Sequence, residues 1–198
     1  MIENKKIAKL LNQNNGIIKA SDAKLFGINN KVLQRQVSYG TLKRVAFGLY
    51  ISSETFPDEY FIAQYRCPKG IYSYETALHF HDLSDRIPMK LTMTIPSGHN
   101  TKLLLEKDSY QFYYCKKEFH EIGIVTMKTI YGNDVAVYDV ERTLCECIKK
   151  ISVLDSDIVL SALKQYMNEP TRDISKLLQY AELFNVKDVM YRYTEVLV

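Results

Sequence analysis

Glycine interrupts the first part of the chain at short intervals, at Gly16, Gly27, Gly40 and Gly48. Glycine readily adopts the left-handed conformation that ends a helix or turns a hairpin, so the elements between these positions are expected to be short. Before the first of these glycines, Ile7, Leu10 and Leu11 recur at helical spacing and predict a first helix. Ser21 is a suitable N-cap for a second short helix, which we expect to end at Gly27.

A third helix is predicted from a cap at Asn29 or Asn30 to about Tyr39. Leu33 and Val37 are spaced to face inward on it. Four polar side chains then lie mainly on its outer face: Lys31, Gln34, Arg35 and Ser38. About ten residues at a rise of roughly 1.5 Å give a rod that fits a DNA major groove about 12 Å wide. In that groove Arg35 suits the edge of guanine, and Gln34 suits the edge of adenine.

After Gly40, the segments TLKRV and LYI can pair as a hairpin around the turn AFG. Three helices followed by a hairpin is the order of a winged helix-turn-helix, in which the third helix would read bases and the hairpin would contact phosphate through Lys43 or Arg44. Neighbouring strand residues point to opposite faces, so only one of these two bases is expected to face DNA directly. The same elements could instead serve as a protein-contact or structural module.

Charge is distributed unevenly along the chain. Residues 1–52 contain nine Lys and Arg against two Asp and Glu, a net charge of +7, whereas the remainder contains 17 against 21, a net charge of −4. This asymmetry suggests a polyanion-binding module joined to a domain with another task. A basic segment can also be merely solvated surface, so the charge supports a nucleic-acid partner only together with the predicted elements.

The polar stretch SSETFPDEY places a linker near residues 52–58. Pro57 is expected in the first turn of the helix that follows, with two acidic residues just inside it. At 198 residues and 46% hydrophobic, the chain can bury a sizeable core. We therefore predict an α+β protein of two domains, a winged helix-turn-helix at residues 1–52 and a mixed sheet-and-helix domain at residues 58–198.

The second domain combines strand-like segments with a helical C-terminal part. KLTMTIP alternates in polarity, which predicts a half-buried strand with Thr92 and Thr94 on its exposed face. YQFYYC, IGIVTMKTI and DVAVYD are further expected strands, and from Val140 onward the pattern is helical. Three polar residues are expected to cap helices in this domain: Ser73, Asp139 and Asp155.

No residue pattern supports catalysis or a metal centre. His79 and His81 are two positions apart, so on a helix they point to nearly opposite sides and cannot chelate one ion. The same holds for Cys145 and Cys147. No phosphate-binding glycine loop and no nucleophile elbow is present. We therefore expect no enzymatic activity, no cofactor and no metal.

The compartment is expected to be the cytoplasm. Four cysteines in a chain of this length are not typical of a disulfide framework. No apolar run is long enough to cross a bilayer, and the polar N-terminus MIENKKIAKLLNQNN is unlike a signal peptide. We expect reduced thiols and no membrane partner.

Three blocks of the sequence together resemble the AbiEi antitoxins of bacterial abortive-infection systems, which are type IV toxin–antitoxin systems. They are VLQRQVSYGTLKRVAFGLYI, YSYETALHFHDLSDRIP and VYDVERTLCECI, in this order and over nearly the whole chain. The resemblance implies a winged helix that represses its own operon at promoter inverted repeats. It also implies a C-terminal domain that neutralises a nucleotidyltransferase-like toxin without a stable complex, as part of phage defence.

The candidate functional residues come from the predicted winged helix-turn-helix and from the resemblance to the antitoxins. Those predicted to bind DNA are Lys31, Gln34, Arg35 and Ser38 for bases or groove, and Lys43 and Arg44 for phosphate. Charged residues within the family-like blocks are weaker candidates for an antitoxin surface, and structural salt bridges would explain them equally well: Asp85, Arg86, Glu141 and Arg142. The family commonly has Gly after the histidine of the middle block, whereas this chain has Asp82, so no tight turn is expected there.

Other functions stay open at this point. The chain could be an ordinary winged-helix transcription regulator whose C-terminal domain senses a ligand or oligomerises. It could also carry a C-terminal enzyme that modifies the toxin or its substrate. No heptad seam is visible, so we expect a monomer, with two copies placed on the operator by an inverted repeat.

Overall fold

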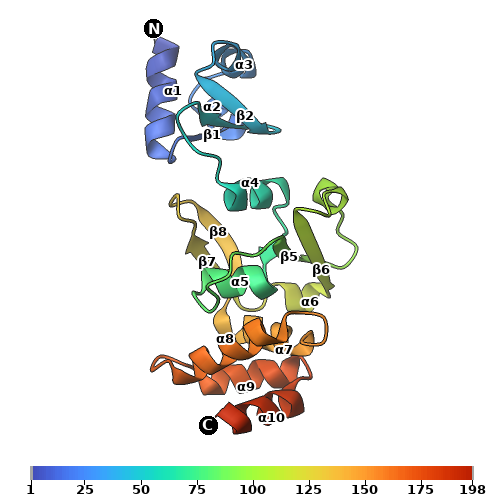
Figure 1. Cartoon of the computed structure of the whole chain (residues 1–198). Helices are drawn as coiled ribbons and strands as arrows, with labels where there is room; N and C mark the ends of the chain where they lie inside the picture. Colours follow the sequence, from blue (N-terminus) through green and yellow to red (C-terminus); the bar gives the residue numbers. More distant parts are fainter. Residues whose placement is uncertain (1, 198) are drawn as a thin grey trace. The chain divides into compact units, whose positions relative to one another are not determined.

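The computed structural model describes residues 2–197, with the side chains of residues 4–194 (Figure 1). Ten α-helices and two sheets are present in the described residues, which confirms the expected α+β class. The chain divides into two compact units. The N-terminal unit contains residues 1–68 and Lys128–Val135, and the C-terminal unit contains Lys69–Met127 and residues 136–198.

Three short helices open the N-terminal unit, as predicted: α1 (Ile2–Gln13), α2 (Ala20–Leu25) and α3 (Asn30–Ser38). Asn29 caps α3, because its side-chain oxygen accepts a hydrogen bond from the Val32 amide at 3.0 Å. The predicted Ser21 cap of α2 is wrong. That helix begins at Ala20, so Ser21 already lies in its first turn, where its hydroxyl donates to Asp22.

A three-stranded antiparallel sheet has the order β1-β3-β2, from β1 (Ile17–Lys19), β2 (Leu42–Ala46) and β3 (Leu49–Ser52). The β2–β3 hairpin is confirmed, whereas β1 was not predicted. Alternate side chains of the sheet enter two different cores. Ile18 and Tyr50 pack with the three helices. Ile17, Leu49 and Ile51 pack on the opposite face.

Helix α4 (Glu59–Arg66) covers that opposite face. Asp58 is its N-cap and accepts a hydrogen bond from the Phe61 amide at 3.1 Å. Pro57 therefore precedes the cap, and the prediction that it lies in the first turn is wrong. The N-terminal unit extends past the predicted linker near residues 52–58 and includes this helix.

Asp58 also holds the loop that connects β7 (Ile124–Lys128) with β8 (Asp134–Tyr138). Asp58 is only 2% exposed. Thr129 Oγ1 donates to Asp58 Oδ2 at 2.6 Å, and Asn133 Nδ2 donates to the same oxygen at 2.7 Å. The loop thus belongs to the N-terminal unit through a buried and hydrogen-bonded carboxylate.

The second sheet has the order β6-β5-β4-β8-β7 and adds β4 (Ile71–Tyr72), β5 (Leu91–Pro96) and β6 (Tyr110–Cys115). The four longer strands confirm the predicted segments. The half-buried character predicted for β5 is wrong, because Thr92 and Thr94 are only 2% and 1% exposed. Helix α5 (Tyr74–Phe80) packs on β5 and supplies hydrogen-bond partners. The Thr92 amide donates to Thr76 Oγ1, and Thr94 Oγ1 donates to Ser73 Oγ.

Helices make up most of the remaining C-terminal unit: α6 (Lys117–His120), α7 (Val140–Lys149), α8 (Ser156–Asn168), α9 (Ile174–Leu183) and α10 (Lys187–Leu197), with a short 3-10 helix, η1 (Lys102–Leu105). Figure 1 shows α7 to α10 gathered beside one another, and their apolar side chains share a core with α5. Asp139 and Asp155 cap α7 and α8 as predicted. Ser73 occupies the N-cap position of α5, but its hydroxyl makes no cap bond.

Two further observations apply to the described residues. No helix among them is both long and apolar enough to cross a membrane. The four cysteines are free thiols. Burial raises the pKa of the Cys145 thiol to about 12, with the nearby Glu146 adding to the effect.

Candidate nucleic-acid interface

The outer face of α3 presents the four side chains predicted for it. All of them are exposed: Lys31, Gln34, Arg35 and Ser38. Their spacing of three and four residues places them in one stripe along the helix. Val32 and Leu33 are buried on the other side. Because α3 contains no Asp or Glu, the exposed stripe offers only basic and neutral polar groups.

Gln36 fixes the rotation of α3. It is 7% exposed, although glutamine is usually a surface residue. Its Nε2 donates to Asn4 Oδ1 of α1 at 3.1 Å, and its Oε1 accepts from Thr41 Oγ1 at 2.7 Å. A rotated helix would leave this buried amide without partners, at a cost of about 1–3 kcal/mol. Sequence periodicity could not identify this role, because the residue is polar.

Strand register decides which hairpin base lies on the helical face. Arg44 pairs with Tyr50, and Lys43 pairs with Ile51. Residues directly opposite each other in an antiparallel pair point to the same face. Arg44 therefore shares the face that packs with α1, α2 and α3. Lys43 lies on the α4 side, where its Nζ donates to the Ser53 carbonyl at 2.9 Å.

The predicted alternation of these two bases is thus confirmed, and both side chains are exposed. Their contact with phosphate stays a prediction. The structure distinguishes them by face, and Arg44 is the one on the face shared with α3.

The hairpin turn presents Phe47, which is 89% exposed. Gly48 completes the turn in the left-handed conformation, with φ of 71°. Its carbonyl oxygen accepts hydrogen bonds from the Ala20 amide at 2.7 Å and from the Tyr65 hydroxyl at 3.3 Å. The Arg44 guanidinium carbon lies 5.4 Å from the centroid of the Phe47 ring. No sequence pattern had selected Phe47 as a candidate.

Two of the weaker candidates, Asp85 and Arg86, are exposed. Arg86 Nη1 lies 2.9 Å from Asp155 Oδ2, in a pair whose side chains are 67% and 40% exposed. Such an exposed pair contributes little to stability. Both candidates border a polar cavity of about 210 Å³, together with Asp157 and Gln165 of α8. Their role in toxin neutralisation stays a prediction.

The other two candidates cannot belong to a contact surface, and that prediction is wrong. Glu141 is 8% exposed and Arg142 is fully buried. Glu141 accepts a hydrogen bond from the Tyr166 hydroxyl at 3.0 Å and pairs with Lys176 at 2.9 Å. Both charged side chains therefore make their contacts inside the C-terminal unit.

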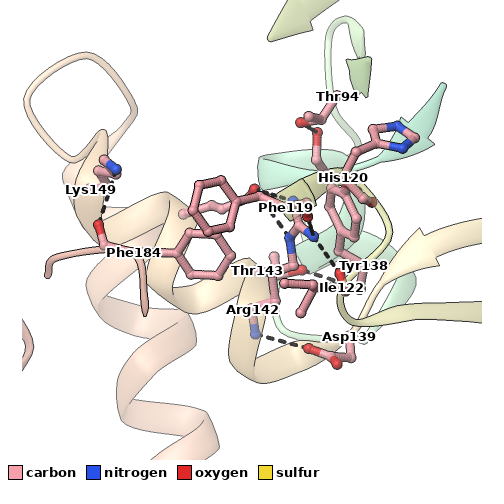
Figure 2. A network of polar contacts seen from close by, with 12 residues as sticks. Thr94, Phe119, His120, Ile122, Tyr138, Asp139, Arg142, Thr143, Lys149 and Phe184 are labelled. Atoms are coloured by element: carbon pink, nitrogen blue, oxygen red, sulfur yellow. Dashed lines mark hydrogen bonds and ion pairs between the residues drawn. The ribbon is translucent and has the colours of Figure 1, made fainter. Parts of the chain in front are cut away.

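Arg142 is the centre of a buried polar network, which Figure 2 shows from close by. Its guanidinium carbon lies 3.3 Å from the centroid of the Tyr138 ring. Its nitrogens donate to the carbonyls of Phe119 and Ile122 and to Glu146 Oε1, the last at 3.0 Å. Burial raises the pKa of Glu146, and the guanidinium only partly opposes this effect. The network joins α7 to Phe119 of α6 and to Ile122 in the chain that follows α6.

Lys176 of α9 connects two carboxylates at the start of α7. Its Nζ lies 3.1 Å from Asp139 Oδ2 and 2.9 Å from Glu141 Oε2. Burial lowers the pKa of Lys176, but its bonds with the two carboxylates outweigh burial and raise it. Sequence spacing could not predict this contact between distant segments. Within the described residues, no group of three or more His, Cys, Asp or Glu could hold a metal ion.

Asp82 corrects one further expectation. It adopts a φ of 55°, the left-handed conformation that glycine favours, directly after the C-cap residue His81 of α5. A tight turn is therefore present at this position, although the chain carries Asp there. Aspartate tolerates this conformation better than most residues with a side chain.

Comparison of the sequence with models of protein families and with curated proteins gives no match. The resemblance to the AbiEi antitoxins therefore stays a prediction that depends on the three sequence blocks.

Proposed function

We propose that this protein binds double-stranded DNA through α3 and the β2–β3 hairpin, and that it represses the promoter of its own operon. One observation supports this most strongly. Helix α3, whose exposed polar stripe lies on its outer side, packs on the same face of the N-terminal sheet toward which the Arg44 side chain points. Three helices followed by this hairpin also have the element order of a winged helix-turn-helix.

The chemistry of the two elements suits different parts of a duplex. Arg35 can donate two hydrogen bonds to guanine, and Gln34 can form two with adenine, both in the major groove. Lys31 and Arg44 can neutralise phosphates, which fixes position but does not read sequence. Nine residues of α3, about 14 Å at 1.5 Å per residue, match the width of that groove.

For the C-terminal unit we propose toxin neutralisation. The support is the resemblance of the three sequence blocks, two of which lie in this unit. The two units have separate hydrophobic cores, so each can perform its own task. On this proposal the protein is an antitoxin that limits both its own expression and the activity of a nucleotidyltransferase-like toxin, without enzymatic activity of its own.

Fluorescence anisotropy tests the DNA-binding half. The protein is titrated into its own promoter and into a scrambled duplex of the same composition, at several salt concentrations. We expect tighter binding to the promoter and a log–log salt slope of about −0.9 for each phosphate contact. Equal affinity for both duplexes at every salt concentration would contradict sequence-specific repression.

Single substitutions of the two hairpin bases are matched variants in this assay. Arg44→Ala is expected to make the slope shallower by about 0.9, because Arg44 lies on the α3 face. Lys43→Ala is expected to change the slope less, because Lys43 lies on the α4 side. The opposite ranking would mean that DNA lies against the α4 side of the sheet.

Co-expression with the toxin encoded beside it tests the antitoxin half. The full chain is expected to restore growth, and so is a DNA-binding-defective Gln34→Ala/Arg35→Ala variant, since the two tasks belong to different units. Failure of the full chain to restore growth would refute toxin neutralisation and leave the regulator as the remaining function.

A further inference from the structure

A cavity of about 360 Å³ lies beside β1 in the N-terminal unit. It is bordered by Ile17 and Lys19 of β1, by Phe61 of α4 and by Asp134 at the start of β8. A second cavity, of about 540 Å³, shares Lys19, Phe61 and Asp134 with the first. Sites for small ligands have volumes of about 300–1,000 Å³. This region of the N-terminal unit therefore has the size of a small-molecule site.

The backbone of β1 directs polar groups toward the first cavity. In the described sheet, β1 pairs with β3 alone, and the Gly16 carbonyl accepts a hydrogen bond from the opposite Ser52 amide at 2.9 Å. Hydrogen-bonded and non-hydrogen-bonded pairs alternate along antiparallel strands, so Ile17 and Lys19 direct their amide and carbonyl groups away from β3. The Ile17 amide accordingly donates to the Asn14 carbonyl at 2.8 Å.

One donor and one acceptor remain at this edge of β1. The Ile17 amide is already bonded, and Lys19 is the N-cap residue of α2, so its carbonyl belongs to that helix. Within the described residues, this leaves the Ile17 carbonyl and the Lys19 amide. Both residues border the cavity. A ligand there meets an acceptor and a donor side by side.

We infer that this cavity binds the adenine ring of a nucleoside or nucleotide. The N6 amino group of adenine donates to the Ile17 carbonyl, and N1 accepts from the Lys19 amide. Adenine carries this donor and this acceptor next to each other on its Watson–Crick edge. The inference goes beyond the proposed function, and none of its steps depends on DNA binding.

Phe61 supplies an apolar wall for the purine. It packs against the core on the α4 side of the sheet, so its ring can cover one face of a base held at the edge of β1. Aromatic side chains stack on every base in this way. The Lys19 ammonium also borders this space, since its Nζ lies 5.3 Å from the centroid of the Phe61 ring.

The charged side chains around the cavity suit a ribose better than a chain of phosphates. Two lysines, Lys19 and Lys128, are balanced by two aspartates, Asp22 and Asp134. Lys128 Nζ already pairs with Asp134 Oδ1 at 2.7 Å. Carboxylates accept hydrogen bonds from ribose hydroxyls in nucleotide sites. Recognition is therefore expected to lie in the adenosine part of the ligand.

Isothermal titration calorimetry of the full-length protein with adenosine tests the inference. Purine riboside lacks the N6 amino group, and 1-deazaadenosine lacks the N1 acceptor, but both keep the size of the ring and the ribose. Each is expected to bind about tenfold more weakly than adenosine, because one backbone group stays unpaired. Cytidine has a similar donor and acceptor on a single ring, and it is expected to bind more weakly because it covers less of Phe61.

AMP and ATP in the same titration distinguish a nucleoside from a nucleotide. Tighter binding of AMP than of adenosine would assign a phosphate contact to Lys19. Weaker binding of both would assign the nucleoside, since the two carboxylates repel added negative charge. Either ranking supports adenine as the group that is recognised.

Side-chain variants separate the wall from the ribose contact. Phe61→Leu keeps apolar packing but loses the ring face, so it is expected to weaken adenosine binding about tenfold. Asp22→Asn is expected to weaken binding of adenosine but not of 9-methyladenine, which has no ribose. Phe56→Leu is the matched control, because Phe56 is 75% exposed in the same unit and borders neither cavity. Thermal unfolding followed by circular dichroism verifies that each variant is folded.

Nuclear magnetic resonance of nitrogen-15-labelled protein locates the ligand without a substitution. The Lys19 amide proton is expected to move downfield when adenosine is added, because a hydrogen bond to N1 deshields it. The Lys43 amide is the internal control, since β3 separates β2 from β1.

Four results would overturn the inference. Adenosine at millimolar concentration could produce neither heat nor a shift of the Lys19 amide. Equal affinity for adenosine, purine riboside and 1-deazaadenosine would remove recognition by the edge of β1. Tighter binding of cytidine than of adenosine would reassign the cavity to a pyrimidine. Shifts confined to the C-terminal unit would place the adenosine site outside this cavity.

Discussion

Asp58 and Asn133 are 75 residues apart in the chain, yet Asn133 Nδ2 donates a hydrogen bond to Asp58 Oδ2 at 2.7 Å. The same oxygen accepts from Thr129, and the other carboxylate oxygen caps α4 through the Phe61 amide. One buried carboxylate therefore organises both a helix start and a distant loop. Each of its partners would be left unsatisfied without it.

Removing this carboxylate is expected to destabilise the N-terminal unit. Asp58→Ala deletes the α4 cap and leaves buried donors on Thr129 and Asn133, so we expect the free energy of unfolding to fall by about 3 kcal/mol. Urea unfolding measures the change, and hydrogen exchange should show faster exchange in residues 128–135. Glu59→Ala, an exposed neighbour, serves as the control. Equal losses in both variants would show that the buried bonds contribute little.

The Arg142–Glu146 pair should show the penalty of an isolated buried charge. Arg142→Ala leaves Glu146 buried and unpaired, and we expect the free energy of unfolding to fall by about 3–5 kcal/mol. The double variant Arg142→Met/Glu146→Leu removes both charges and should recover most of the loss. Urea denaturation of both variants measures this. A double variant no more stable than Arg142→Ala would mean that the bonds to the carbonyls of Phe119 and Ile122 dominate.

Acid should destabilise the C-terminal unit through two histidines. Burial lowers the pKa of His81 and of His120, and hydrogen bonds to the carbonyls of Tyr138 and Lys69 only partly oppose this. The unfolded chain then binds more protons than the folded one below the ordinary pKa of about 6.5. The stability that the two neutral histidines contribute is fully present above that pH. It is lost as the pH falls through the lower pKa that these histidines have in the folded protein.

His81→Gln/His120→Gln tests this pH dependence, since glutamine can still donate to a carbonyl but does not titrate. We expect the decline in unfolding free energy between pH 7 and pH 5 to be smaller in this variant than in the wild type. Urea unfolding at several pH values provides the comparison. Parallel curves for the two proteins would attribute the acid sensitivity to other groups.

If α3 reads bases, a substitution that keeps the charge of a side chain but changes its shape should weaken binding to the promoter. Arg35→Lys keeps the positive charge but cannot form the two parallel hydrogen bonds to guanine, so binding should weaken by about 1–3 kcal/mol at the cognate promoter. Binding to a scrambled duplex should hardly change. Lys150→Ala, an exposed position in the C-terminal unit, is the control. Equal weakening on both duplexes would reduce Arg35 to a phosphate contact.

Local sequence determined the elements of this protein well. Three short helices, the basic hairpin and most strands follow from periodicity, and the caps Asn29, Asp139 and Asp155 follow from residue type. The helices and their caps depend on contacts within about four residues, and the hairpin pairs two segments joined by a short turn, so a sequence pattern contains the signals for them. The exposed stripe of α3 follows for the same reason.

Only the tertiary structure decided where several other side chains lie. Arg142 lies in the interior because Glu146 and the carbonyls of a distant segment surround its guanidinium. Thr92 is buried because α5 covers the face of β5 that its alternation had predicted to be exposed. Strand register places Arg44, and not Lys43, on the sheet face shared with α3. Two hydrogen bonds from other helices fix the turn that presents Phe47. Most of these outcomes depend on partners far away in the chain. Hydrophobic and hydrogen-bond energies depend on proximity in space, which no local pattern records.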